Sequence, residues 1–185
     1  MKLTVLALCC ASALALTATS VRAADAGSAR PGPAIERFGP VYDVDSPDFS
    51  TPTGIVYRAV FDVALSPESN EQLNPRIESI ARFLNMQARA GIKPAHTQLS
   101  LVVHGAAAKD MLSSIAYKAR FGVENPNAPL LAALQSSGVR VILCGQSAAH
   151  KGFAREDLAP GVEIATSAMT ALVVLQSEGY GLIAF

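Results

Sequence analysis

The sequence of 185 residues has no tryptophan, little charge and no excess of charge of either sign. Its 15 lysine and arginine residues balance 15 aspartate and glutamate residues, which excludes a strongly basic protein that binds nucleic acid through its overall charge. Only 16% of the residues are charged and 50% are hydrophobic, which excludes a disordered chain without a core. The length is that of one domain.

The short motifs of several enzyme classes are also missing. The chain has no glycine-rich dinucleotide fingerprint, no phosphate-binding P-loop, no nucleophilic serine elbow and no pair of cysteines separated by two residues. Dinucleotide, ATP, hydrolase and thioredoxin chemistry therefore have no local support. Arginine and aromatic residues form no interleaved patch. We expect no nucleic-acid partner and no cofactor.

Residues 1–23 have the pattern of a secretory signal peptide. Lys2 supplies a positive charge, an apolar run follows, and small residues precede a cleavage site after Ala23. The run is too short to cross a bilayer, and no later apolar run is longer. We therefore expect a periplasmic or secreted protein with no membrane span after cleavage.

Cleavage at this site changes the meaning of the cysteine content. It removes Cys9 and Cys10, and Cys144 is then the only thiol among the 162 residues that remain when 23 are subtracted from 185. In an oxidising compartment a lone cysteine has no intramolecular disulfide partner. Such a cysteine is buried, paired with another chain or used in chemistry, so Cys144 is the first candidate for a functional residue.

Residues 24–53 have the composition of an extended arm. Five of the 11 prolines lie here, and no helical or strand period is sustained. The segment 38–44 carries several apolar side chains, so we expect part of the arm to pack on its own domain or on a neighbouring subunit. The acidic residues Asp43, Asp45 and Asp48 lack the spacing, the glycine and the terminal glutamate of a calcium-binding loop.

Residues 54–185 alternate short apolar runs with helical stretches, which is typical of a single α/β domain. The clearest helix begins at the N-cap Asn74, has Pro75 in its first turn, and ends near Gly91. Asn127 and Ser167 are placed to cap two later helices. Further helices are expected at about 107–118, 129–136, 146–151 and 168–177, and strands at 55–63, 99–103, 139–143, 162–165 and 180–185.

This alternation predicts a three-layer sandwich, in which a mostly parallel sheet of about five strands carries helices on both faces. In such a sheet, ligands bind beyond the carboxyl ends of the strands. His104 directly follows one strand and Cys144 directly follows another, so we expect both at the same rim. Gly105 and Gly145 come next and leave room for a backbone or a ligand to approach.

The surroundings predicted for Cys144 favour its thiolate. A thiol at the start of a helical turn faces unpaired backbone N–H groups and the positive end of the helix dipole. The turn that follows contains Gln146 and Ser147, and His150 and Lys151 add positive charge if their side chains fold back over the thiol. The alternative is that Cys144 is a small buried hydrophobic residue at the end of a core strand.

His104 also has two interpretations. A histidine at the end of a strand acts as a general acid or base, or it is a structural group held by a hydrogen bond. His104, Cys144 and His150 together offer imidazole and thiolate ligands that suit zinc or copper. No two of them have a diagnostic spacing, so we assign no metal site and keep metal binding as an alternative.

A family resemblance rests on three segments of the sequence. They are Val139-Arg-Val-Ile-Leu-Cys-Gly-Gln-Ser-Ala-Ala-His-Lys-Gly152, Leu158-Ala-Pro-Gly-Val162 and Leu175-Gln-Ser-Glu-Gly-Tyr180. These segments resemble the DsrE/DsrF-like (YchN-like) family of sulfur-handling proteins, and the resemblance extends loosely over residues 54–185. Its sharpest part is a cysteine that ends a strand and is followed by two basic residues and a glycine, here Cys144, His150, Lys151 and Gly152.

The resemblance implies an α/β sandwich that assembles as a homo-oligomer, either a trimer or a hexamer. In the sulfur-relay members, the matching cysteine accepts sulfane sulfur as a persulfide and passes it to a partner protein. This implies that Cys144 carries sulfur between a small sulfur anion or donor protein and an acceptor protein, with His104 near the same pocket. Those members act in the cytoplasm, whereas this chain carries an export pattern. The alternative function is a non-catalytic oligomeric module that binds a small ligand or a metal.

Overall fold

The computed structural model describes residues 27–184, and the predicted signal peptide at 1–23 lies outside the described residues. Five strands form one parallel sheet in the order β4-β3-β2-β1-β5. The strands are β1 (Tyr57–Val63), β2 (Thr97–Val103), β3 (Arg140–Cys144), β4 (Glu163–Ala165) and β5 (Gly181–Ala184). The predicted α/β fold with a mostly parallel five-stranded sheet is confirmed.

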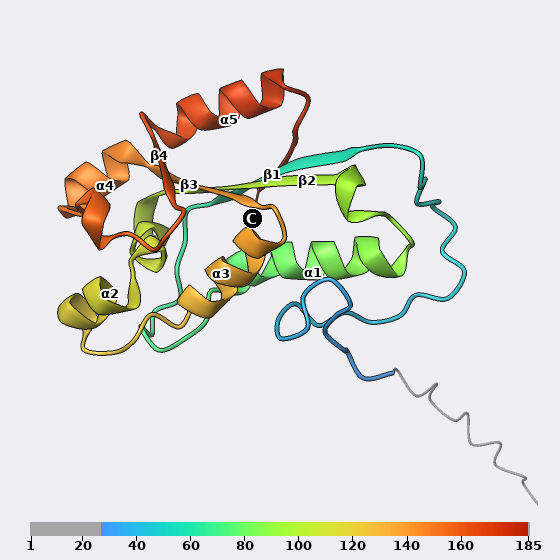
Figure 1. The fold of residues 1–185 in the computed structure, drawn as a ribbon, viewed down its shortest axis with the longest axis horizontal. Coiled ribbons are helices and arrows are strands. Elements are labelled where there is room, and N and C mark those ends of the chain that lie inside the picture. Colours follow the sequence, from blue (N-terminus) through green and yellow to red (C-terminus); the bar gives the residue numbers. More distant parts are fainter. Residues whose placement is uncertain (1–26, 185) are drawn as a thin grey trace, which may run out of the picture.

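Helices lie on both faces of this sheet (Figure 1). On one face are α1 (Pro75–Arg89) and α3 (Ala128–Ser136), while α5 (Ala168–Ser177) crosses the other face alone. Helix α5 crosses the sheet because it joins β4 at one edge to β5 at the opposite edge. The remaining helices, α2 (Ser114–Phe121) and α4 (Gly145–Lys151), lie toward the carboxyl ends of the strands.

Three short 3-10 helices are also present in residues 27–184: η1 (Pro94–His96), η2 (Gly105–Met111) and η3 (Arg155–Asp157). Within residues 27–184, none of the helices is long and apolar enough to cross a membrane.

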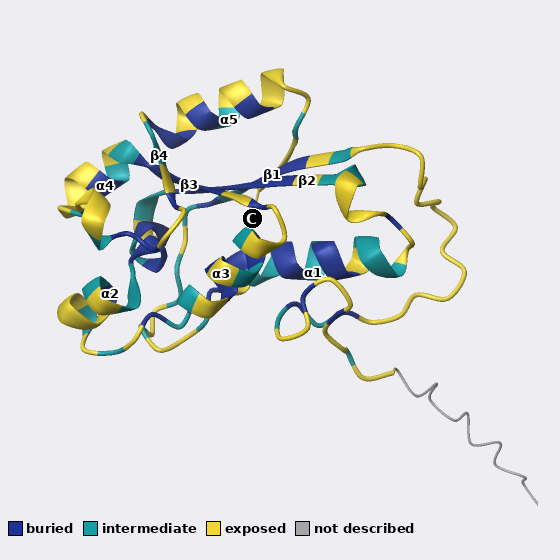
Figure 2. Ribbon diagram, viewed as in Figure 1, coloured by how far each residue is buried: buried dark blue, intermediate teal, exposed yellow. Residues whose placement is uncertain are grey.

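The sheet separates two hydrophobic cores of unequal size (Figure 2). Phe61 and Val63 of β1 belong to the larger core, which is shared with α1 and α3. Their neighbour Val60 belongs to the smaller core under α5, together with Val102, Ile142 and Cys144. This alternation follows from the period of two in a strand, and it places Cys144 on the α5 face of the sheet.

The ends of α1 and α5 follow the sequence signals. The Asn74 side chain accepts a hydrogen bond from the backbone N–H of Arg76 at 3.0 Å, and Pro75 occupies the first turn of α1. The Ser167 hydroxyl accepts a hydrogen bond from the N–H of Thr170 at 3.0 Å and begins α5. Both predicted caps are confirmed.

Two other local predictions were wrong. The helix expected at 107–118 is instead η2 followed by α2, because the backbone at Leu112 and Ser113 is extended and the Ser113 hydroxyl begins a new helix by accepting the N–H of Ala116. Asn127 makes no side-chain cap for α3. Its side-chain oxygen accepts the backbone N–H of Asn74 at 2.8 Å and so joins the starts of α3 and α1.

Residues 30–43 of the N-terminal arm form a closed loop against α1. Arg30 and Val41 exchange two backbone hydrogen bonds of 3.0 and 2.9 Å. Arg89, in the last turn of α1, donates to backbone carbonyls of the loop and to the Asp43 carboxylate at 2.7 Å. The guanidinium groups of Arg30 and Arg89 lower the pKa of Asp43.

Asn85 holds the middle of this loop from inside α1. Its side chain is fully buried, and its oxygen accepts the N–H of Ile35 at 2.8 Å. Its amide nitrogen donates to three loop carbonyls, those of Ile35 at 3.1 Å and of Phe38 and Gly39 at 2.9 Å. A Cβ at Gly39, where φ is +64°, would collide with the α1 backbone at Ala81 and Arg82, so only glycine fits this approach.

Candidate functional site

Cys144 lies at the carboxyl rim of the sheet, at the junction of β3 and α4. It is the last residue of β3 and directly precedes Gly145, the first residue of α4. The residue is 6% exposed. No Cβ fits at Gly145, because it would lie 2.6 Å from the carbonyl oxygen of Ala165. Glycine at this position therefore lets the start of α4 pack directly against the end of β4.

Two helix starts supply hydrogen bonds to the thiol of Cys144. From α4 come the Ser147 hydroxyl and the backbone N–H groups of Gln146 and Ser147, and from α5 comes the N–H of Ala168. Burial raises the pKa of the Cys144 thiol, but these hydrogen bonds outweigh burial and hold the pKa below its usual range. The surroundings therefore stabilise the thiolate relative to the thiol.

The Ser147 hydroxyl is oriented by a third element. Its oxygen accepts the backbone N–H of Gly105 at 3.0 Å. Because an accepted hydrogen bond occupies an oxygen lone pair, the hydroxyl proton remains available for Cys144. Gly105 has φ of +57°, and its Cβ position lies 3.0 Å from the carbonyl oxygen of Ala64. The loop after β2 is thus coupled to the thiol through one serine.

His104 lies at the same rim, and its imidazole contacts an acidic residue that sequence reasoning missed. The His104 Nε2 atom is 3.0 Å from the Asp62 Oδ1 atom. The two side chains are 32% and 24% exposed, so both are partly open to solvent. Asp62 is the one charged residue within the otherwise apolar run 59–63, and that interruption is the signal that marks it.

The remaining predicted site residues divide into two groups. Gly105, Gly145, Gln146 and Ser147 surround Cys144, and the Gln146 side chain also donates to the carbonyl of Thr166 at 3.4 Å. His150 and Lys151 occupy the last turn of α4 and are exposed. They lie at the opposite end of the helix from the thiol, and none of the hydrogen bonds that lower the pKa of Cys144 comes from them.

Among residues 27–184, no group of three or more histidine, cysteine, aspartate and glutamate side chains is placed to hold a metal ion. His104, Cys144 and His150 therefore do not form a metal centre as they are arranged.

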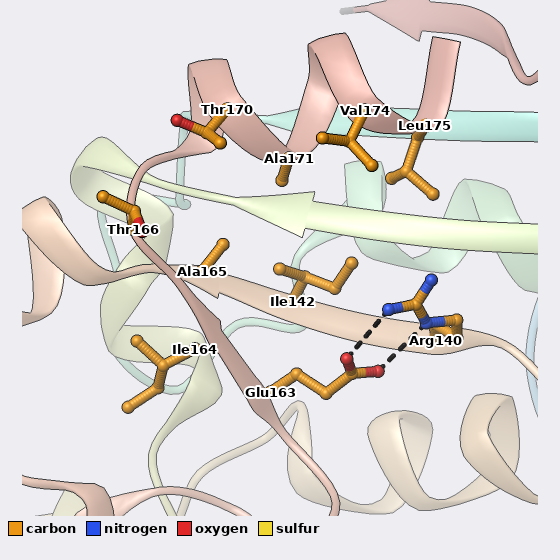
Figure 3. Close-up of a pocket in the computed structure, with 10 residues that line it drawn as sticks. All are labelled: Arg140, Ile142, Glu163, Ile164, Ala165, Thr166, Thr170, Ala171, Val174 and Leu175. Atoms are coloured by element: carbon orange, nitrogen blue, oxygen red, sulfur yellow. Dashed lines mark hydrogen bonds and ion pairs between the residues drawn. The ribbon is translucent and has the colours of Figure 1, made fainter. Parts of the chain in front are cut away.

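A hollow of about 350 Å³ lies between α5 and the strands β3 and β4, and one end of it reaches the Cys144 rim (Figure 3). Its walls are mostly apolar. At one end, Arg140 and Glu163 form a bidentate ion pair with distances of 2.9 and 3.1 Å. Ala165, which pairs with Cys144 in the sheet, also lines the hollow, whereas Cys144 does not. The hollow is a neighbour of the thiol site and is separate from it.

Two solved structures share this fold. One is a protein of unknown function, MTH1491, from Methanobacterium thermoautotrophicum, with 19% identity, a TM-score of 0.54, and coverage of 70% of this chain and 99% of that one. The other is the ychN protein from E. coli, with 21% identity, a TM-score of 0.51, and coverage of 69% and 99%. The sequence matches no curated protein.

Residues 58–185 match the model of the DsrE/DsrF-like family. The matched region contains the whole sheet except the first residue of β1, together with the rim that carries His104 and Cys144. This chain belongs to the DsrE/DsrF-like family.

Proposed function

We propose that this protein is an exported carrier of sulfane sulfur, in which the Cys144 thiolate takes a sulfur atom from a small sulfur anion and passes it to an acceptor protein. The observation that carries the proposal is the set of hydrogen bonds that lower the pKa of Cys144 at the carboxyl rim of a parallel sheet. Family membership supports it, because sulfur relay is associated with DsrE-like proteins. Export is supported by the charge and apolar run of residues 1–23.

The chemistry of loading is a nucleophilic substitution at sulfur. With thiosulfate as donor, the Cys144 thiolate attacks the outer sulfur, a new S–S bond forms, and sulfite leaves with the electron pair of the bond that breaks. The product is a persulfide whose terminal sulfur carries the negative charge. We expect the N–H and hydroxyl donors around the Cys144 thiol to stabilise this anion as well.

Incubation with thiosulfate or polysulfide, followed by intact-mass spectrometry, tests the proposal. The wild-type protein is expected to gain one sulfur atom, and Cys144→Ser is expected to gain none because serine is not a nucleophile for sulfane sulfur under these conditions. The same mass shows whether protein recovered from its native host begins at Ala24. Each treated protein is compared with its own untreated form, and an equal mass gain in wild type and Cys144→Ser would reject the carrier and leave the non-catalytic binding module.

We also propose that the protein assembles as a homo-oligomer, a trimer or a hexamer, through the outer face of α5. This helix is apolar almost throughout its length. Ala171 and Leu175 are buried on the sheet, whereas Met169 and Val173 are 75% and 67% exposed. A helix that is apolar on all sides is typical of a buried position, so the exposed face of α5 fits an interface with a second copy of the chain.

Val173→Glu is expected to dissociate this assembly. The change places a charge on the α5 face and removes a side chain whose burial contributes about 1.5 to 3 kcal/mol per copy. Light scattering coupled to size-exclusion chromatography measures the molar mass. Met86→Glu adds the same charge at an exposed apolar residue of α1, on the opposite face of the sheet, and serves as control. A wild-type monomer, or a Val173→Glu protein of unchanged molar mass, would show that this face is not the interface.

A further inference from the structure

Asp62 and His104 form a hydrogen-bonded pair on the same face of the sheet as Cys144. Val60, Val102 and Cys144 all belong to the core under α5. Asp62 is two residues beyond Val60 and His104 is two residues beyond Val102, so strand alternation points both side chains toward that face. The 3.0 Å contact between His104 Nε2 and Asp62 Oδ1 agrees with this placement.

His104 and Cys144 occupy neighbouring positions on adjacent strands. The last paired residues of β2 and β3 are Val103 and Leu143, and His104 and Cys144 are the next residue on each strand. Adjacent strands lie about 4.8 Å apart. The N–H of His104 also bonds to the carbonyl of Val63 at 3.1 Å, which continues the sheet ladder past the strand end.

The contact with Asp62 determines which nitrogen of His104 can act as a base. A carboxylate accepts hydrogen bonds and donates none, so the Nε2 atom that faces Asp62 carries the proton. In the neutral imidazole the Nδ1 atom is then unprotonated and available to accept a proton. The His104 side chain is 32% exposed, so a molecule that approaches the rim can reach the imidazole.

We propose that His104 is the general base for the outgoing half of sulfur transfer, that Asp62 positions it, and that the acceptor is a protonated thiol. The inference rests on the proposed function, because it requires a persulfide on Cys144. Loading from thiosulfate begins with the Cys144 thiolate and moves no proton, so it needs no base. Unloading to a neutral thiol does need one, because the thiolate and not the thiol attacks sulfur.

The step balances without any additional reactant. His104 Nδ1 takes the acceptor proton, and the resulting thiolate attacks the outer sulfur of the persulfide. A bond forms between the acceptor and the outer sulfur, which keeps its negative charge. The bond between the outer sulfur and Cys144 Sγ breaks, and its electron pair stays on Sγ, which is the thiolate that Ser147 and Ala168 stabilise. The proton then passes from His104 to solvent.

Unloading kinetics of the full protein test this assignment. The protein is loaded with thiosulfate, desalted and mixed with glutathione, and the loss of the sulfur atom from Cys144 is followed by mass spectrometry between about pH 6 and 9. His104→Gln is expected to slow unloading near neutral pH about a hundredfold, and Asp62→Asn about tenfold or more. Added imidazole is expected to restore part of the rate in His104→Ala.

The pH dependence of the unloading rate shows whether His104 acts as a general base or has a structural role only. In His104→Gln the rate depends on glutathione that is already ionised, so it should rise about tenfold per pH unit below the pKa of that thiol, whereas the wild-type rate should rise less steeply. Asp48→Asn, at an exposed position outside the site, is the control. Normal unloading and a wild-type pH profile in His104→Gln would overturn the inference while loading still succeeds. Failure of wild-type loading would overturn the proposed function itself.

Discussion

Near neutral pH, Ser147→Ala is expected to slow the reaction of Cys144 with a small neutral alkylating reagent by about tenfold to a hundredfold. The Ser147 hydroxyl is the largest of the contributions that lower the pKa of this thiol. A hydrogen bond to a charged group contributes about 1.5 to 3 kcal/mol, which corresponds to about a ten- to hundredfold difference in the fraction of thiolate. Less thiolate gives a proportionally slower reaction, because the thiolate is the nucleophile.

The pH dependence of the alkylation rate shows whether a changed pKa of Cys144 causes the slower reaction. A lowered pKa means that the thiol of the folded wild type ionises at a lower pH than the thiol of the variant. The rates of wild type and Ser147→Ala should therefore differ near neutrality and converge at alkaline pH, where both thiols are ionised. Ser147→Thr keeps a hydroxyl and should retain most of the rate. Ser177→Ala changes a serine at the far end of α5 and should have no effect. Equal rates for Ser147→Ala and wild type at all pH values would contradict the assignment.

Asn85→Ala is expected to lower the free energy of unfolding by about 3 kcal/mol or more. The change removes four hydrogen bonds between α1 and residues 35–39. The backbone groups of Ile35 and Gly39 that lose their partner are buried, and each unsatisfied buried group costs about 1 to 3 kcal/mol. For a chain of this size, the loss corresponds to a melting temperature lower by about 6 to 12 °C.

Thermal and urea unfolding, followed by circular dichroism, measure this loss. Met86→Ala, on an exposed position of the same helix, is the control and should change stability little. Limited proteolysis provides a second measurement, since Asn85→Ala should release the loop at 30–43 and make it a cleavage site before the sheet unfolds. A variant with wild-type stability and an intact loop would show that Asn85 does not hold the arm.

Much of the fold and one part of the site could be predicted from local sequence pattern. The parallel arrangement follows from the alternation of strands and helices, and it places His104 and Cys144 at one rim because each follows a strand directly. The starts of two helices could also be predicted, since Asn74 and Ser167 cap them as expected. Periodicity and capping are local properties, which is why a single sequence reveals them.

The unpredicted features depend on contacts between distant segments. The pairing of β5 with β1 determines that α5 crosses the sheet, and the pairing of β4 with β3 brings the N–H of Ala168 to Cys144. Asp62 could not be predicted as the partner of His104, because that contact depends on which strand lies beside β2. The sequence predicts that His150 and Lys151 add positive charge if their side chains fold back over the thiol, but Gly145–Lys151 forms a helix long enough to carry them away from it. Asn85 follows Ala81 by four residues and so continues the buried stripe of α1, a spacing that indicates a buried polar side chain.

The order of the elements along the chain also sets the order in which the thiol acquires its hydrogen bonds. Cys144 precedes β4 and the start of α5, which together deliver the Ala168 N–H. A nascent chain that ends before Ala168 therefore has the cysteine without one of the hydrogen bonds that lower its pKa. We expect Cys144 in such a chain to be a weaker nucleophile than Cys144 in the folded domain.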